Sequence, residues 1–369
     1  MTTSSAPHLG ALARCYTFGM GTIKRVAWAL GFILACGLLV MTGTDQFHQL
    51  ANAHRDVTVF LLLSLLLTIP TGIVTLASGY LIEALIVGWS RSSLRSLRAA
   101  PASVSASIRL DLLSMAMSLL PHRRLGYILS LGLLYVVDAH MLRSTNLSVT
   151  RYLPTWGIQV VFLLLFQSFI MYWVHRMEHA IPALWALHKF HHSAYQMTML
   201  TAVRQTELMK GVEQFLPLVF LALVTEPIAA RPSAGSPLFA LFAVYFAYRC
   251  FIRVNQYLCH SNLTTGYGWI GRWLLVSPRM HRLHHAVAPR FHDKNFTFDL
   301  VIWDRLFGTY ATCEEADLAS ISLGLEHGPF NGDGSIKGVL RDYFVTTYVV
   351  FWQSLRTGIK AWLPARREL

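Results

Sequence analysis

Charged residues are scarce in this chain. Asp, Glu, Lys and Arg make up only 14% of its 369 residues, whereas 54% are hydrophobic, and the mean hydropathy is +0.44. An ordinary soluble protein of this length carries more charge and less apolar character. The composition therefore excludes a typical soluble globular protein and favours a protein of the membrane.

Several cofactor and partner motifs are also missing. The five cysteines show no Cys-x-x-Cys spacing, so an iron–sulfur cluster or attached haem is not expected and reduced structural thiols are the default. No Gly-x-Gly-x-x-Gly fingerprint indicates a bound nucleotide. The net charge of +12 has no nucleic-acid-binding motif beside it, and the basic residues lie next to apolar segments. A nucleic-acid partner is therefore excluded.

Long apolar runs account for the composition. Four of them, at residues 26–43, 57–77, 125–142 and 156–174, approach the ~20 residues that span a bilayer. The first is longer than a signal-peptide core and no convincing cleavage site follows it, so a signal peptide is not expected. Two shorter runs, at 215–228 and 237–248, predict either two crossings or a re-entrant hairpin. Both alternatives return the chain to the side it left, which gives four to six transmembrane helices.

The distribution of charge predicts the orientation in the membrane. Arginines crowd the segment between the second and third runs: Arg91, Arg95, Arg98, Arg109, Arg123 and Arg124. The positive-inside rule places this segment, both termini and the histidine-rich region in the cytoplasm. Arg143 and Arg151, in the predicted outer loop, oppose this orientation. The preference for Arg over Lys suggests a GC-rich bacterial genome, so the expected location is the inner membrane of a bacterium.

Half of the sixteen histidines fall into three short motifs. These are His175-x-x-x-His179, His188-x-x-His191-His192 and His281-x-x-His284-His285. Residues three and four apart share one face of a helix, so each motif can aim two or three imidazoles at one point. Eight imidazoles exceed the needs of one four-coordinate ion, which favours a site for two metals. Ordinary core or surface roles are expected for His8, His48, His54, His122, His140 and His327.

The flanking residues show a family resemblance between residues 159 and 310. It is carried by Tyr172-Trp-Val-His-Arg-Met-Glu-His179, Leu187-His-Lys-Phe-His-His-Ser193, Ser277-Pro-Arg-Met-His-Arg-Leu-His-His285, Asp293-Lys-Asn-Phe296 and Ile302-Trp-Asp-Arg-Leu-Phe-Gly-Thr-Tyr310. In order and spacing these segments resemble the fatty acid hydroxylase/sterol desaturase superfamily. The resemblance implies an integral membrane enzyme with a histidine-ligated pair of iron ions. Such enzymes use dioxygen and external electrons to hydroxylate or desaturate lipids.

The resemblance also implies further roles. His260, in Tyr257-Leu-Cys-His260-Ser-Asn262, is expected as a ninth ligand. Gln256 stands where some relatives have a histidine, so it is a weak ligand, a neighbour of a ligand, or neither. His292 is expected to be structural. Gln205-Thr206-Glu207 replaces a His-Pro pair of many relatives and leaves the subfamily and substrate open. The predicted metal ligands are His175, His179, His188, His191, His192, His260, His281, His284 and His285.

Carboxylates are few near these motifs. Glu178 lies one position from His179 and points off the shared face, so it either orients a ligand ring or is solvated. Asp293, Asp299 and Asp304 either accept imidazole N–H groups or have structural roles. An all-imidazole shell suits Fe, Zn, Cu or Ni, and does not by itself identify the metal.

The overall prediction is an all-α, polytopic membrane protein with a cytoplasmic helical catalytic domain that carries the histidine motifs. Its regions are 1–124, an N-terminal membrane part, 125–312, the catalytic part, and 313–369, a C-terminal amphipathic tail. Apolar and aromatic residues at helical spacing in the tail predict a helix that lies on the membrane surface or packs against the catalytic part.

The predicted function is di-iron, dioxygen-dependent hydroxylation of a membrane lipid, fatty acyl, sterol or polar. Electrons would come from a ferredoxin- or cytochrome-type donor that docks on the basic cytoplasmic face. Desaturation or oxidative methyl removal from a sterol is the nearest alternative. A zinc hydrolase would not need so many ligands, and a metal transporter would place its histidines within the spans. The sequence leaves open the lipid, the carbon attacked, the electron donor and the oligomeric state.

Overall fold

The fold is given by a computed structural model that describes residues 57–89, 92–93, 102–119, 153, 155–224, 237–318, 320–326, 330 and 335–362. The predicted spans at 26–43 and 125–142, and the basic segment apart from Arg109, lie outside these residues. The described part is helical and contains no extended strand. Its only β pairings are two isolated bridges, Leu275 with Leu300 and Ala286 with Leu323. The all-α class is thereby confirmed for the described residues.

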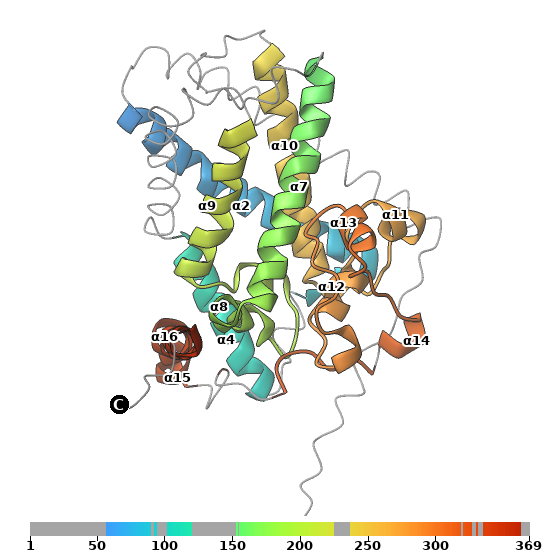
Figure 1. The fold of residues 1–369 in the computed structure, drawn as a ribbon. Coiled ribbons are helices and arrows are strands. Elements are labelled where there is room, and N and C mark those ends of the chain that lie inside the picture. The colour runs from blue at the N-terminus through green and yellow to red at the C-terminus, as the bar shows by residue number, and fades with distance from the viewer. Residues whose placement is uncertain are drawn as a thin grey trace, which may run out of the picture.

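The described residues form fifteen helical segments. In chain order they are α2 (Val57–Val87), α4 (Ala102–Leu119), α7 (Trp156–Ala180), α8 (Pro182–His192), η5 (Met199–Val203), α9 (Glu207–Val224), α10 (Pro237–Cys259), α11 (Gly268–Trp273), α12 (Pro278–His284), η6 (Pro289–Phe291), α13 (Ile302–Leu306), α14 (Glu315–Leu318), α15 (Ile336–Arg341), η7 (Asp342–Thr346) and α16 (Thr347–Trp362). Long α7 and α10 run side by side, and α8 and α12 lie near one end of α7 (Figure 1).

Helix α7 is the membrane-span candidate of the described residues. Its segment Gly157–Ala180 is long and apolar enough to cross a bilayer, by length and composition only. The apolar part of α2, Gly72–Val87, is shorter. The runs predicted at 215–228 and 237–248 lie within or beside α9 and α10. The number of spans and the orientation of the chain therefore stay predictions.

A sharp corner separates α7 from α8. The residue between them, Ile181, has an extended backbone, as expected for a residue that precedes proline. Pro182 then occupies the first turn of α8, where its missing N–H costs no hydrogen bond. The corner turns the histidines of α8 back toward those at the end of α7. Helix α12 begins in the same way, at Ser277, whose side chain accepts from the Met280 amide, followed by Pro278.

A buried ion pair joins α4 to the end of α8. Arg204 and Asp111 are fully buried, with 3.2 Å between Nη1 and Oδ1. The Arg204 guanidinium also donates to the Phe190 carbonyl at 3.1 Å and to Ser193 Oγ at 2.7 Å. By its position next to the histidine motifs, Arg204 would be expected among the basic residues of the cytoplasmic face. Its complete burial shows instead that it is a structural cation.

The C-terminal tail packs against the rest of the protein. Helix α16 contacts α8, and Val339 and Tyr343 join Leu110 and Phe190 in one apolar cluster. Of the two alternatives for the tail, packing against the catalytic part is therefore observed. Phe344, Val345, Val349 and Trp352 nevertheless remain exposed, so the helix also has an apolar outer face.

Candidate metal centre

All nine predicted ligands come together in two adjacent groups. His175, His179, His188, His192 and His284 form a five-histidine group, and His191, His260, His281 and His285 form a four-histidine group. Within each group the candidate ligand atoms lie within 4.8 Å of one another. Consecutive residues of one motif serve different groups, as with His191 and His192. Two neighbouring sites, rather than one, follow from this division.

The nitrogen–nitrogen distances fit metal coordination. The Nε2 atom of His188 lies 3.1 Å from Nε2 of both His175 and His192. In the second group, His260 Nε2 lies 3.2 Å from His191 Nε2 and 2.9 Å from His281 Nε2. Two nitrogens bound at ~2.1 Å to one ion lie ~3.0 Å apart at a right angle and ~3.4 Å apart at a tetrahedral angle. The observed separations match adjacent ligands of one ion.

The opposite ring nitrogens of several histidines have fixed partners. The Nδ1 atoms of His175, His260 and His284 lie 2.5, 2.7 and 2.8 Å from the carbonyl oxygens of Phe296, Gln256 and Lys294 respectively. Because a carbonyl only accepts, each Nδ1 carries the proton and each Nε2 presents a lone pair to its group. Such outer partners are what fix metal-ligating imidazoles in orientation and tautomer.

Several buried nitrogens in the groups lack a hydrogen-bond partner. They are Nδ1 of His188 and His191, Nε2 of His179 and His284, and both ring nitrogens of His285. A buried polar atom without a partner costs free energy, and lone pairs that face one another at about 3 Å repel. A cation at the centre of each group would satisfy Nε2 of His179, Nε2 of His284 and one ring nitrogen of His285. The donor set therefore fits two metal ions.

Burial keeps the imidazoles neutral. Desolvation, reinforced for most of them by neighbouring imidazoles, lowers the pKa of His188, His191, His192, His281, His284 and His285 well below the usual value. Desolvation is also the main cause that lowers the pKa of His260, to about 4. Neutral imidazole is the form that binds metals. The groups are therefore ready for metal at neutral pH without losing protons.

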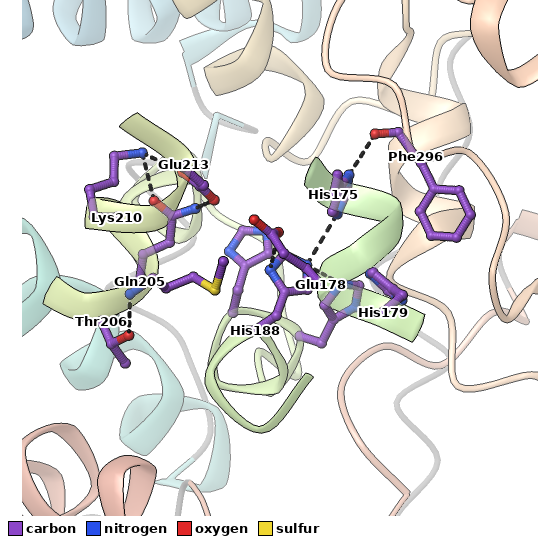
Figure 2. A network of polar contacts seen from close by, with 12 residues as sticks. His175, Glu178, His179, His188, Gln205, Thr206, Lys210, Glu213 and Phe296 are labelled. Atoms are coloured by element: carbon purple, nitrogen blue, oxygen red, sulfur yellow. Dashed lines mark hydrogen bonds and ion pairs between the residues drawn. The ribbon is translucent and has the colours of Figure 1, made fainter. Parts of the chain in front are cut away.

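Glu178 connects the five-histidine group to helix α9. Its buried carboxylate lies 2.9 Å from Nδ1 of His188, and the side chain of Glu213 lies beyond it. Glu213 accepts hydrogen bonds from Lys210 Nζ, at 2.9 Å, and from Gln205. Figure 2 shows Glu178 between His188 and this cluster of Gln205, Lys210 and Glu213. Of its two predicted alternatives, orientation of a ligand ring is therefore supported, and a solvated role is wrong.

The aspartates after the third motif are mainly structural. Asp299 accepts from Ser168 and from Tyr248, which ties α7 to α10. Asp304 accepts hydrogen bonds from the amides of Phe296 and Thr297 at 2.8 and 3.0 Å. It thereby holds in place the Phe296 carbonyl, which accepts the hydrogen bond from His175 Nδ1. Asp293 lies 3.6 Å from Nδ1 of His179 and is exposed.

His292 and Gln256 belong to neither histidine group. His292 is exposed, and its Nε2 lies 2.9 Å from the Val287 carbonyl, in keeping with a structural role. The Gln256 side chain accepts a hydrogen bond from Arg253. The Gln256 backbone carbonyl, and not its side-chain amide, accepts the hydrogen bond from His260 Nδ1. The sequence reading missed Lys210 and Glu213 as neighbours of the centre. Only their (i, i+3) spacing after the second motif signalled them, and such pairs are common on exposed helices.

Comparison with known proteins places this site in a family. The family model described as fatty acid hydroxylase matches residues 160–309, which include every histidine of both groups. This segment belongs to the fatty acid hydroxylase superfamily. The match confirms the resemblance carried by the histidine motifs and lies within the predicted catalytic part, 125–312.

Relatives of the fatty acid hydroxylase segment include named lipid enzymes. Alkylglycerol monooxygenase of Danio rerio is 30% identical over 240 residues, 61% of this chain and 48% of that protein. The Homo sapiens protein of that name is 30% identical over 236 residues, 61% and 47% of the two chains. Ornithine lipid hydroxylase of Rhizobium tropici is 31% identical over 155 residues, 42% of each chain. The chain thus spans about half the length of these relatives. No solved structure matches it.

Proposed function

We propose that this protein is a membrane-bound, di-iron, dioxygen-dependent oxidoreductase that hydroxylates a lipid. The observation that carries the proposal is the division of nine imidazoles into groups of five and four, each with ligand-to-ligand separations suited to one ion. The family of residues 160–309 and the names of the relatives support a lipid substrate. The proposed metals are two iron ions.

The proposed metals, the imidazoles and the partners of the imidazoles have distinct roles. Bound redox metal together with dioxygen supplies the oxidising power to attack an unactivated C–H bond, which side chains cannot supply. The nine imidazoles would hold the metals through neutral nitrogens. The carbonyls of Phe296, Gln256 and Lys294 hold protons on Nδ1 of His175, His260 and His284. The Glu178 carboxylate, 2.9 Å from His188 Nδ1, electrostatically favours the tautomer that carries the proton on that nitrogen.

The position of the centre suits a water-insoluble substrate. His175 and His179 lie in the last turns of the apolar segment Gly157–Ala180. A lipid that enters from the leaflet beside α7 can therefore place a carbon near the five-histidine group without passing through water. We propose a polar or neutral membrane lipid, because the relatives' names denote an alkylglycerol and an ornithine lipid.

Electrons are proposed to come from an external ferredoxin- or cytochrome-type donor. The sequence has no nucleotide fingerprint or iron–sulfur cysteine pattern of its own. Arg290 is exposed and Lys189 half-buried near the histidine motifs, and such basic residues attract an acidic donor. In the proposed orientation this face and both termini are cytoplasmic, at the inner membrane of a bacterium.

Metal analysis combined with lipidomics tests the function. The detergent-purified protein is expected to hold about two irons per chain, by analogy with two four-to-six-coordinate sites. Lipids of cells that express it should gain one oxygen relative to cells that express His188→Ala, whereas His292→Ala should behave as the unaltered protein. Lipids that lose two hydrogens instead would indicate desaturation. Zinc with no oxidised lipid, after iron reconstitution, would contradict the proposal.

A further inference from the structure

Two short helices present a patch of exposed apolar side chains close to the centre. On and just after α11 it contains Trp269, Ile270, Trp273 and Leu274, and on α13 it contains Ile302 and Leu306. Trp269 and Leu306 are each 66% exposed. We call these six residues the α11–α13 patch. Contiguous exposed apolar residues of this size mark an interaction surface rather than ordinary scatter.

The patch is rigid. Arg305 of α13 stacks over the Trp273 ring at 4.0 Å, over the Tyr310 ring at 4.0 Å, and donates from Nε to the Arg272 carbonyl at 2.6 Å. The Val301 amide also donates to the Leu274 carbonyl at 3.0 Å. These contacts hold α11 and α13 together, so the apolar side chains are presented as one surface.

Helix α13 packs beside the middle of the candidate span. Trp303 donates from Nε1 to Ser168 Oγ at 2.9 Å, and its ring lies 5.1 Å from that of Phe169. Ser168 and Phe169 are the midpoint of Gly157–Ala180. A bilayer core of ~30 Å that encloses the apolar N-terminal half of this helix reaches at least to the level of its midpoint. The outer surface of α13 beside that midpoint then faces lipid or the lipid boundary, not bulk water.

The chemistry of the patch agrees with this position. Tryptophan is enriched where acyl chains meet headgroups, because its ring is apolar and its N–H is polar. Arg272 and Arg305 add cations beside the two exposed tryptophans, as expected next to anionic lipid headgroups. Exposed Val161 and Leu165 continue the apolar surface along α7.

We propose that the α11–α13 patch is embedded in the membrane, at the boundary between acyl chains and headgroups. The proposal rests on the membrane location in the proposed function and deepens it. Asp304, on α13, accepts hydrogen bonds from the amides of Phe296 and Thr297. The Phe296 carbonyl in turn accepts the hydrogen bond from His175 Nδ1. The patch therefore fixes the depth of the five-histidine group relative to the leaflet, and with it the carbon of a lipid that can reach the metals.

Spin labels report directly on lipid and water contact. In a cysteine-free background, single cysteines replace Leu306 and Ile270 in the patch, Val161 on the span, and exposed Ser320 as the aqueous control. The full-length protein is placed in vesicles of phosphatidylethanolamine and phosphatidylglycerol. Oxygen concentrates in lipid and a nickel chelate stays in water, so the ratio of their effects on each label reports its surroundings.

The expected ratio of oxygen to nickel accessibility is similar at Leu306, Ile270 and Val161, and several-fold higher than at Ser320. A ratio at Leu306 and Ile270 equal to that at Ser320, with Val161 still in lipid, overturns the patch proposal alone. Shielding of both patch labels from both reagents also overturns it, because protein then covers the patch. If Val161 is itself in water, the membrane location in the proposed function fails with it. The readout does not depend on activity.

Discussion

At the scale of single residues, the orientation of His188, one of the proposed metal ligands, depends on Glu178. Glu178 contacts His188 Nδ1 and belongs to neither histidine group, so it acts as a positioning residue. Glu178→Ala should weaken metal binding by about 10–100-fold, the usual cost of losing an outer partner of a ligating imidazole. Titration of iron or cobalt into the metal-free protein measures this.

Glu178→Gln provides the rescue for that experiment. The amide oxygen still accepts from His188 Nδ1, so the glutamine variant should bind metal more tightly than the alanine variant. Glu314→Gln, at an exposed carboxylate, is the matched control. Equal affinities for Glu178→Ala and the unaltered protein would show that His188 needs no orienting partner.

His260 tests the division between the two groups. It contacts His191 and His281 of the four-histidine group and comes from outside the three motifs. His260→Ala should release the metal of that group and retain the other, leaving about one ion per chain of the two proposed. Elemental analysis of the purified protein checks this. Full occupancy of both sites in this variant would remove His260 from the ligand set.

At the scale of elements, the buried Arg204–Asp111 pair holds α4 against the end of α8. Arg204→Met leaves the Asp111 carboxylate buried without its cation, which should cost about 3–5 kcal/mol of unfolding free energy. The double variant Arg204→Met/Asp111→Leu should recover much of that loss, since no unpaired charge remains. Denaturant unfolding of the metal-free protein measures both. A double variant less stable than the single one would contradict the explanation.

Sequence patterns predicted which histidines gather better than they predicted the residues around them. The spacing of His188, His191 and His192 already fixed a common helix face, and periodicity does not depend on distant contacts. The partners of the ligands are different in kind. Phe296 contributes a backbone carbonyl and Glu213 arrives from another helix, so nothing local marks either residue. Pro182 favours a helix start at this point in the sequence, but the way the corner brings α8 toward the end of α7 depends on the tertiary arrangement.

At the scale of the whole molecule, acid should destabilise the metal-free protein. The pKa of seven buried histidines is lowered in the folded state, with His260 at about 4 against the usual 6.5. Their contribution to stability is therefore complete above about pH 6.5 and is lost as the pH falls toward the folded values. Burial raises the pKa of buried carboxyls such as Asp111 and Asp304, which opposes the trend, but the affected histidines are more numerous.

Thermal unfolding in the presence of a chelator measures this dependence. The midpoint should fall steadily as the pH drops below neutrality. His292→Ala, at an exposed ring that belongs to neither group, should leave the slope unchanged. A midpoint independent of pH between neutrality and the pKa of His260 would show that the rings are not held neutral by burial.

Because adjacent histidines belong to different groups, the two proposed metal ions would also cross-link the chain. His191 and His260 are 69 residues apart and share one group, so an ion between them closes a loop of that length in any partly unfolded state. A cross-link of this span restricts the unfolded chain by about 4 kcal/mol. His192 belongs to the other group, so the two loops are anchored at neighbouring residues. Loss of either ion would loosen the chain on both sides of α8, and newly made protein without iron would be the form most exposed to proteases.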